Sequence, residues 1–131
     1  MGRTTQISVS LPNKRGQLAE LCGALAAQKV NILAISVAEN TDLGTVRMVV
    51  SKPDAAAKKL DEMGLTYAQS EVLMVRLPHK IGALAEAAAK LRKARVDISY
   101  VYGSTGSTRG NAAIVVATAN LKAAEKALGG K

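Results

Sequence analysis

LPNKRGQLAE at residues 11–20 returns as LPHKIGALAE at residues 77–86, an offset of 66 positions (77 − 11). The same offset relates Leu25 to Leu91 and Val30 to Val96, with no insertion between the copies. A repeat of this kind means that one structural unit occurs twice, so a site formed by the units comes in related pairs. The chain of 131 residues is therefore predicted to contain two units, at residues 1–70 and 71–131.

The small size of each unit predicts that the units share an interface. A domain of about 60 residues buries only about 60 % of the surface that its unfolded chain exposes, which leaves it marginally stable alone. We therefore expect contacts between the units and, in addition, a homodimer.

The composition limits the classes of function. A single cysteine, Cys22, excludes an internal disulfide and a cysteine-based zinc site, and its place on an apolar helix face predicts a core residue. The sequence contains no run of about 18 apolar residues and no signal segment at its start, which favours a cytoplasmic protein without membrane contact. The net charge of +8 comes from scattered residues, which favours solubility over a nucleic-acid surface.

The pattern of the first unit predicts the order β-α-β-β-α-β. Apolar residues alternate with polar ones in the expected strands and recur at helical spacing between Gly16 and Lys29, while Pro53 and Gly64 bound a second helix. The expected elements are a strand at 6–11, a helix at 16–29, strands at 32–39 and 45–51, a helix at 53–63 and a strand at 66–69, with a hairpin loop at 40–44.

The second unit repeats this order as far as its second helix. We expect a strand at 72–77, a helix at 81–94, a strand at 98–102, a loop at 103–111, a strand at 112–117 and a helix at 121–128. The counterpart of the strand at 66–69 is missing, so one sheet edge is unpaired, and we expect another chain or the segment 66–77 to cover it. The predicted fold class is α+β, with two ferredoxin-like units whose antiparallel sheets pair side by side and carry their helices on one face.

The turn after the first strand of each unit resembles that of the ACT domain family. In the first unit Asn13, Gly16, Leu18 and Asn31-Ile32 match the family pattern, and in the second unit Gly82, Leu84 and Asp97-Ile98 match it. The chain has Arg15 and Ile81 where the family has proline, and His79 at the position of Asn13. The resemblance implies a regulatory module that binds a small molecule, most often an amino acid, between units paired through their second strands and first helices.

These residues suit the recognition of a free amino acid. A helix that begins after each turn offers N–H groups and a partial positive charge to a carboxylate, and glycine lets the ligand approach the backbone. Asn31 or Asp97 of one unit would accept hydrogen bonds from the ammonium group near the turn of the other unit. The predicted ligand-binding residues are Asn13, Lys14, Arg15, Gly16, Gln17, Leu18 and Asn31 in the first unit, and His79, Lys80, Ile81, Gly82, Ala83, Leu84 and Asp97 in the second.

The same residues also fit structural roles. Gly16 and Gly82 would relieve crowding where a strand meets a helix, Asn31 and Asp97 would cap turns, and His79 would be an ordinary loop residue. The glycine-rich stretch at 103–110 lacks the Gly-Lys-Ser/Thr ending of a phosphate-binding loop.

Other classes of function fit the sequence less well. RNA-recognition domains share the strand order but stack bases on sheet aromatics, whereas this chain has three Tyr and no Phe or Trp. Catalysis requires a nucleophile with a base, a carboxylate pair or metal ligands, and no such set is evident. We therefore predict a regulatory amino-acid sensor without cofactor, metal or enzyme activity. The alternative left open is a docking subunit of an amino-acid biosynthetic enzyme that binds no ligand itself.

Overall fold

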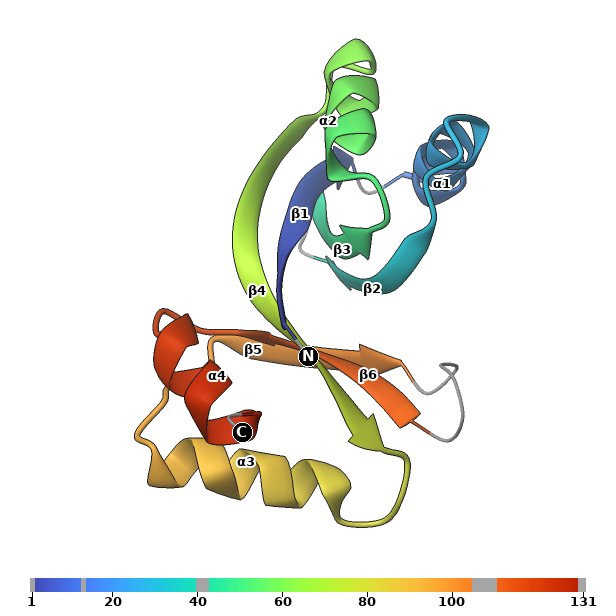
Figure 1. The fold of residues 1–131 in the computed structure, drawn as a ribbon. Coiled ribbons are helices and arrows are strands. Elements are labelled where there is room, and N and C mark those ends of the chain that lie inside the picture. Colours follow the sequence, from blue (N-terminus) through green and yellow to red (C-terminus); the bar gives the residue numbers. More distant parts are fainter. Residues whose placement is uncertain (1, 13, 40–42, 105–110, 130–131) are drawn as a thin grey trace. The chain divides into compact units, whose positions relative to one another are not determined.

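The computed structural model describes residues 2–12, 14–39, 43–104 and 111–129 (Figure 1). The paired strands form antiparallel ladders within one sheet, in the order β2-β3-β1-β4-β6-β5. This confirms the predicted α+β class with antiparallel strands. The elements are β1 (Gly2–Pro12), α1 (Gln17–Ala27), β2 (Ile32–Glu39), β3 (Leu43–Val50), α2 (Pro53–Glu62), β4 (Thr66–Pro78), α3 (Ala83–Lys93), β5 (Tyr100–Ser104), β6 (Asn111–Ala117) and α4 (Leu121–Leu128).

The strand β4 differs from the prediction, because the two strands expected at 66–69 and 72–77 are one continuous strand. No glycine or proline lies between Gln69 and Val72, so the sequence there contains no residue that would interrupt an extended backbone. The strand β5 begins at Tyr100, two residues later than expected. Asn13 and most of the loops expected at 40–44 and 103–111 lie outside the described residues.

The chain divides into two compact units in a way that assigns its first residues to the second one. The first unit comprises Thr5–Ser70, and the second comprises Glu71–Lys131 together with Met1–Thr4. On the side of β4 that faces away from β6, the neighbouring strand is β1. The start of β1 therefore occupies the place of the strand that the second unit lacks, and the expectation that another chain or the segment 66–77 fills it is wrong.

The side chain of Arg3 ties the start of β1 to the second unit. Its guanidinium lies 3.8 Å from the carboxylate of Glu71 in β4 and 3.4 Å from that of Glu125 in α4. All three side chains are at least one-third exposed, so these ion pairs contribute little stability individually. They show that Arg3 lies beside β4 and α4, both of which belong to the second unit.

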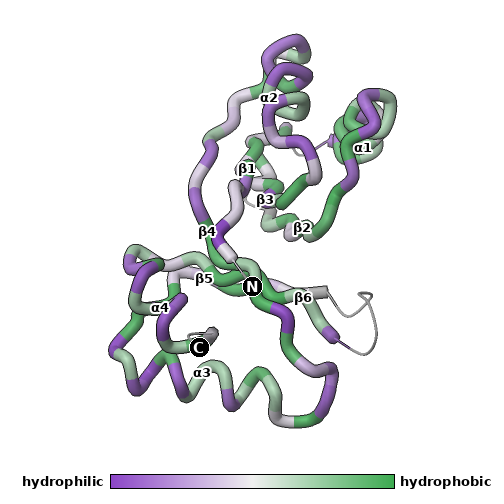
Figure 2. Tube along the Cα trace, viewed as in Figure 1, coloured by the Kyte–Doolittle hydropathy of each residue, from purple (hydrophilic) through white to green (hydrophobic). Residues whose placement is uncertain are grey.

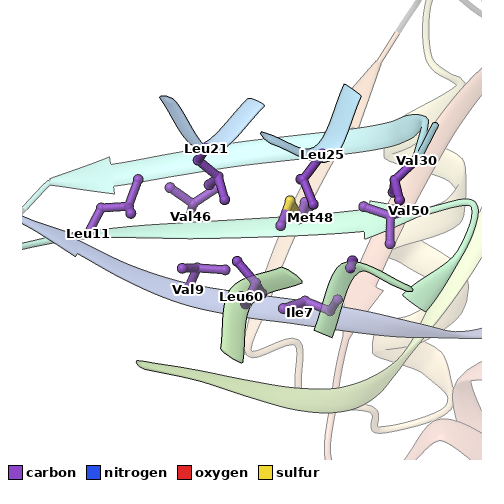
Figure 3. Close-up of a cluster of buried hydrophobic side chains, with 11 residues drawn as sticks. Ile7, Val9, Leu11, Leu21, Leu25, Val30, Val46, Met48, Val50 and Leu60 are labelled. Atoms are coloured by element: carbon purple, nitrogen blue, oxygen red, sulfur yellow. The ribbon is translucent and has the colours of Figure 1, made fainter. Parts of the chain in front are cut away.

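The core of the first unit is formed by helices α1 and α2 packed on its strands. Figure 3 shows Leu25 of α1 next to Met48 of β3, Leu21 next to Val46, and Leu60 of α2 next to Val9. Leu21, Leu25, Leu60 and Met48 are fully buried. Burial of a leucine side chain contributes about 1.5–3 kcal/mol, which explains the apolar stripe of each helix. Cys22 is only partly buried, so the prediction that it is a core residue is wrong.

The core of the second unit is built in the same way but from smaller side chains. Its buried cluster contains Leu73, Leu91 and Val116, with Ala124 of α4 at the place where the helix meets the sheet. Figure 2 shows the apolar residues concentrated along β6, most of whose residues are buried.

The C-terminal ends of α1 and α3 have the same backbone conformation, so the two units are alike in structure as well as in sequence. After α1, Lys29 has a φ of 59° and the Val30 N–H donates to the Leu25 carbonyl over 3.0 Å. After α3, Arg95 has the same φ and the Val96 N–H donates to the Leu91 carbonyl, again over 3.0 Å. This left-handed helix ending usually contains glycine, so both units use an unfavourable residue at the same place.

Candidate functional site

The two predicted ligand-binding turns have the same backbone geometry. Gly16 precedes α1 with a φ of 86°, and the Glu20 N–H donates to its carbonyl over 3.0 Å. Gly82 precedes α3 with a φ of 88°, and the Glu86 N–H donates to its carbonyl over the same distance. These φ values favour glycine. A Cβ atom added at either position would meet no atom within 4 Å, so the crowding explanation for the two glycines is wrong.

In the first unit, three predicted residues line one hollow beside the turn. Lys14, Gln17 and Leu18 surround a volume of about 330 Å³ together with residues from the ends of β1, β2 and β3. Arg15 and Gly16 are exposed. The turn of the first unit therefore has a basic side chain and an amide beside an apolar wall.

In the second unit, the predicted residues divide between two smaller spaces. Lys80 and Ala83 line a hollow of about 130 Å³, whereas Leu84 lines an apolar cavity of about 150 Å³. His79 and Gly82 are exposed, and Ile81 is fully exposed at 102 % of its reference area. The two turns are thus alike in backbone but differ in the spaces that adjoin them.

Asn31 and Asp97 lie at the opposite end of their own unit from the turn. In the first unit, Pro12 before the turn pairs with Leu43 at the start of β3. The Asn31 N–H donates to the Ser51 hydroxyl over 2.9 Å, and Ser51 follows the end of β3, eight residues after Leu43 (51 − 43). In the second unit Pro78 pairs with Asn111, and the carbonyl of Asp97 accepts from the Thr118 hydroxyl over 2.7 Å.

A strand advances about 3.3 Å per residue, so more than about 20 Å separates the two ends within either unit. No single unit brings its turn and its Asn31 or Asp97 together. The hydrogen bonds of the Asn31 N–H and the Asp97 carbonyl involve backbone groups, so they hold the segment before the second strand in place without using either side chain.

Both units expose apolar side chains where the first helix lies beside the second strand. We call these the edge strips: Leu18, Ile35 and Val37 in the first unit, and Leu84, Ile98 and Val101 in the second. Each of these side chains is at least 40 % exposed. The pairing Ile35↔Met48 places Ile35 on the same sheet face as a core residue, so the strip continues the core to the surface.

The described ranges contain no group of three or more His, Cys, Asp or Glu residues placed to hold a metal ion. Over the same ranges, no helix is long and apolar enough to cross a lipid bilayer. The charged groups at the turns that the structure describes are mainly basic, with Lys14 and Arg15 exposed in one unit and Lys80 exposed in the other. This charge suits an anionic group.

Comparison with known proteins identifies the family. The family model described as an ACT domain pair matches residues 3–128. The chain belongs to the ACT domain family. Protein BT0572 of Bacteroides thetaiotaomicron is 32 % identical, with a TM-score of 0.88, over 96 % of this chain and 86 % of that one. No curated protein sequence matches the chain significantly.

Regulatory subunits of aspartate kinase share the fold of this ACT pair. The ligand-free subunit from Thermus thermophilus superposes with a TM-score of 0.65 at 16 % identity, covering 97 % of this chain and 95 % of that one. The subunit from Thermus flavus gives 0.61 at 18 % identity, covering 98 % and 95 %. At these identities the similarity concerns the fold.

Several residues at the site do not follow from the sequence reasoning. The edge-strip residues Ile35, Val37 and Val101 lie in strands that read as ordinary half-buried strands, and only the knowledge that β2 and β5 are terminal strands marks them as exposed. Ala87 beside the apolar cavity could have been found, because the repeat aligns it with Leu21.

Proposed function

We propose that this ACT domain pair is a non-catalytic regulatory protein of the cytoplasm that senses a free amino acid between ACT units and transmits binding to a partner. The amino-acid carboxylate binds the turn before α1 or α3, and the ammonium group binds Asn31 or Asp97 of the facing unit. The protein acts as a homodimer, and it needs no cofactor. Ligand binding stabilises the paired state of the units, which a partner enzyme recognises.

The observation that carries the proposal is the separation of each half-site from its complement. Within a unit, more than about 20 Å lies between the turn and the Asn31 or Asp97 position. An amino acid spans far less than this, so a site that uses both groups requires two units. The exposed edge strips supply apolar surface for that pairing, and each strip adjoins its turn through Leu18 or Leu84.

The energetics are sufficient for a metabolite sensor. A hydrogen bond to a charged group contributes about 1.5–3 kcal/mol. A micromolar dissociation constant corresponds to about −8 kcal/mol, which two or three such bonds and a buried side chain can supply.

The first test is thermal melting of the full chain against each of the twenty amino acids at millimolar concentration. A ligand at about 100 times its dissociation constant stabilises the protein by about 2.7 kcal/mol, which raises the melting temperature by several degrees. We expect one amino acid or one chemical group of them to stand out. A flat panel would contradict the proposal.

The second test assigns the site with charge-matched variants. Gly82→Asp places a negative charge where the carboxylate binds, whereas Gly82→Asn has nearly the same shape and tolerates the positive φ equally well. We expect the aspartate variant to lose at least tenfold more affinity than the asparagine variant. Gly16→Asp and Gly16→Asn test the first unit in the same way. Equal affinity in each pair would remove the turns from the site.

One observation favours the docking alternative. The edge strips expose six aliphatic side chains, which also fit the surface of a partner protein. If no amino acid raises the melting temperature but a strip substitution such as Val37→Asp abolishes association with an enzyme of amino-acid biosynthesis, the protein is a docking subunit.

A further inference from the structure

The second unit contains an aliphatic cavity of about 150 Å³ beneath α3. Val75, Leu91 and Val116 form its buried floor, and the edge-strip residues Leu84 and Ile98 lie at its exposed rim. The cavity therefore reaches from the core to the edge strip, and a small molecule has access to it from the surface of the unpaired unit without unfolding.

The repeat shows why this cavity exists. The position of Ala87 in the second unit corresponds to that of Leu21 in the first, which is fully buried and fills the space between α1 and the sheet (Figure 3). Alanine has three fewer carbon atoms than leucine. Ala88 likewise replaces Cys22, and Val101 replaces Ile35, so three neighbouring positions are all smaller in the second unit.

An unfilled space of this size is unfavourable, because interiors are normally packed to the density of organic crystals. An enclosed cavity of about 150 Å³ with apolar walls binds a compact apolar molecule of about six carbon atoms in another protein, which indicates the size of ligand that such a volume accommodates. The occupant best matched to this cavity in size and polarity is therefore an apolar group of about three to six non-hydrogen atoms.

Charged side chains lie next to the cavity. A hollow of about 130 Å³ shares Leu77, Ala87 and Leu128 with the cavity and is also lined by Lys80, Glu86 and Lys90. The two lysines beside an aliphatic pocket suit the carboxylate of a ligand with an apolar side chain. A ligand made only of hydrocarbon would form no electrostatic interaction with these charged side chains.

We propose that the second unit binds the side chain of an aliphatic amino acid in this cavity, with the ligand carboxylate at the turn before α3, beside Lys80 of the adjoining hollow. The inference rests on the proposed function and names the class of amino acid sensed: leucine, isoleucine, valine or methionine. The first unit, in which Leu21 fills the equivalent space, does not share this pocket.

The experiment combines calorimetric titration with two leucine substitutions on α3. Ala87→Leu restores the side chain of the first unit and fills the cavity. Ala89→Leu adds the same atoms to an exposed position that lines neither space, and it controls for changes in helix propensity. Thermal melting checks that each variant folds. Ala87→Met, with a flexible side chain, is the second filling variant if Ala87→Leu does not fold.

We expect the unaltered protein to bind aliphatic amino acids and to bind glycine and aspartate at least tenfold more weakly. Ala87→Leu should reduce affinity for the aliphatic ligand at least tenfold and raise the melting temperature, because a void is filled. Ala89→Leu should change affinity less than twofold. Lys80→Gln should weaken the binding of the aliphatic amino acid. It should not weaken the binding of an alcohol that carries the same side chain but no carboxylate.

Two different failures are distinguishable. If the chain binds a polar amino acid best, or if Ala87→Leu and Ala87→Met both retain affinity for an aliphatic one, the cavity is not the side-chain pocket although the protein remains a sensor. If none of the twenty amino acids binds, the proposed function fails, and the inference fails with it.

Discussion

Replacing Leu21 by alanine should convert the packing of the first unit into that of the second. Leu21 is fully buried in the cluster with Leu25 and Met48, and Ala87 shows what alanine at this position leaves behind. Leucine-to-alanine substitutions in cores cost about 2.7–5.0 kcal/mol, rising by about 24 cal/mol per Å³ of residual cavity.

The structure sets the expected magnitude for Leu21→Ala. At that coefficient, a cavity as large as the 150 Å³ of the second unit adds about 3.6 kcal/mol to the transfer cost of the removed side-chain atoms. Because the second unit is also smaller at two neighbouring positions, the new cavity is expected to be somewhat smaller than this one. We therefore expect a loss of about 4 kcal/mol in the free energy of unfolding of the first unit, since the transfer term adds to a reduced cavity term.

Urea unfolding with hydrogen exchange of the α1 amides measures this loss and assigns it to one unit. Leu18→Ala is the matched control, because Leu18 lies in the same helix but is 41 % exposed, so we expect it to lose less than about 1.5 kcal/mol. A loss below about 1 kcal/mol for Leu21→Ala, or equal losses for both variants, would refute the reasoning that this residue fills the space left open in the second unit.

Three further predictions concern single local features. Arg95→Gly should stabilise the protein by about 0.5–1 kcal/mol in urea unfolding, because a φ of 59° favours glycine; a loss would show that the Arg95 side chain matters more than its backbone. Asn120→Ala should cost about 1 kcal/mol in the same assay, since the Asn120 side chain caps α4 by accepting from the Ala123 N–H over 3.1 Å; an unchanged midpoint would contradict the cap. The hydroxyl of Tyr67 donates to Asp61 over 3.0 Å, which together with burial raises the pKa of Tyr67 above 10.0, so this bond stabilises the fold below pH 10 and is lost as the pH rises through the raised pKa. Asp61→Asn should lower that pKa in an absorbance titration, and an unshifted titration would exclude the bond.

Much of the fold follows from the sequence because the repeat and the periodicity act over long stretches. The strand Ile32–Glu39 and the helix Leu121–Leu128 have the predicted bounds, since alternation and helical spacing are strong there. Pro53 begins α2 as predicted, and Gly64 ends it with a φ of 72°.

The features that sequence reasoning missed depend on contacts between distant segments. The repeat predicts two separate strands at 66–69 and 72–77, yet β4 is one continuous strand of a single sheet. The sequence also does not predict that Gly2–Thr4 belongs to the second unit. The alternation of apolar and polar residues identifies a strand, but it does not identify the strands that lie next to it in the sheet.

The candidate site was predictable only in its backbone part. Gly16 and Gly82 carry the positive φ that makes glycine necessary, and the sequence contains that information. Lys29 and Arg95 have positive φ without glycine, so no residue type indicates it, and hydrogen bonds to the preceding helix impose it instead. The spaces beside the turns depend on side chains from three or four elements, which a motif does not specify.

The difference between the two units argues against the view that they are redundant copies. If selection acted on stability alone, the second unit would have a leucine at Ala87, because filling a cavity commonly gains about 0.5–2 kcal/mol. The backbone of the two turns is nearly identical, with φ values of 86° and 88°, so the carboxylate recognition that we propose for the turn applies equally to both units. The side chains differ where a ligand side chain would lie. Under the proposed function, both units would bind the carboxylate that all amino acids share. Only the second unit would contact the ligand side chain, and this contact is what a sensor needs to discriminate among amino acids.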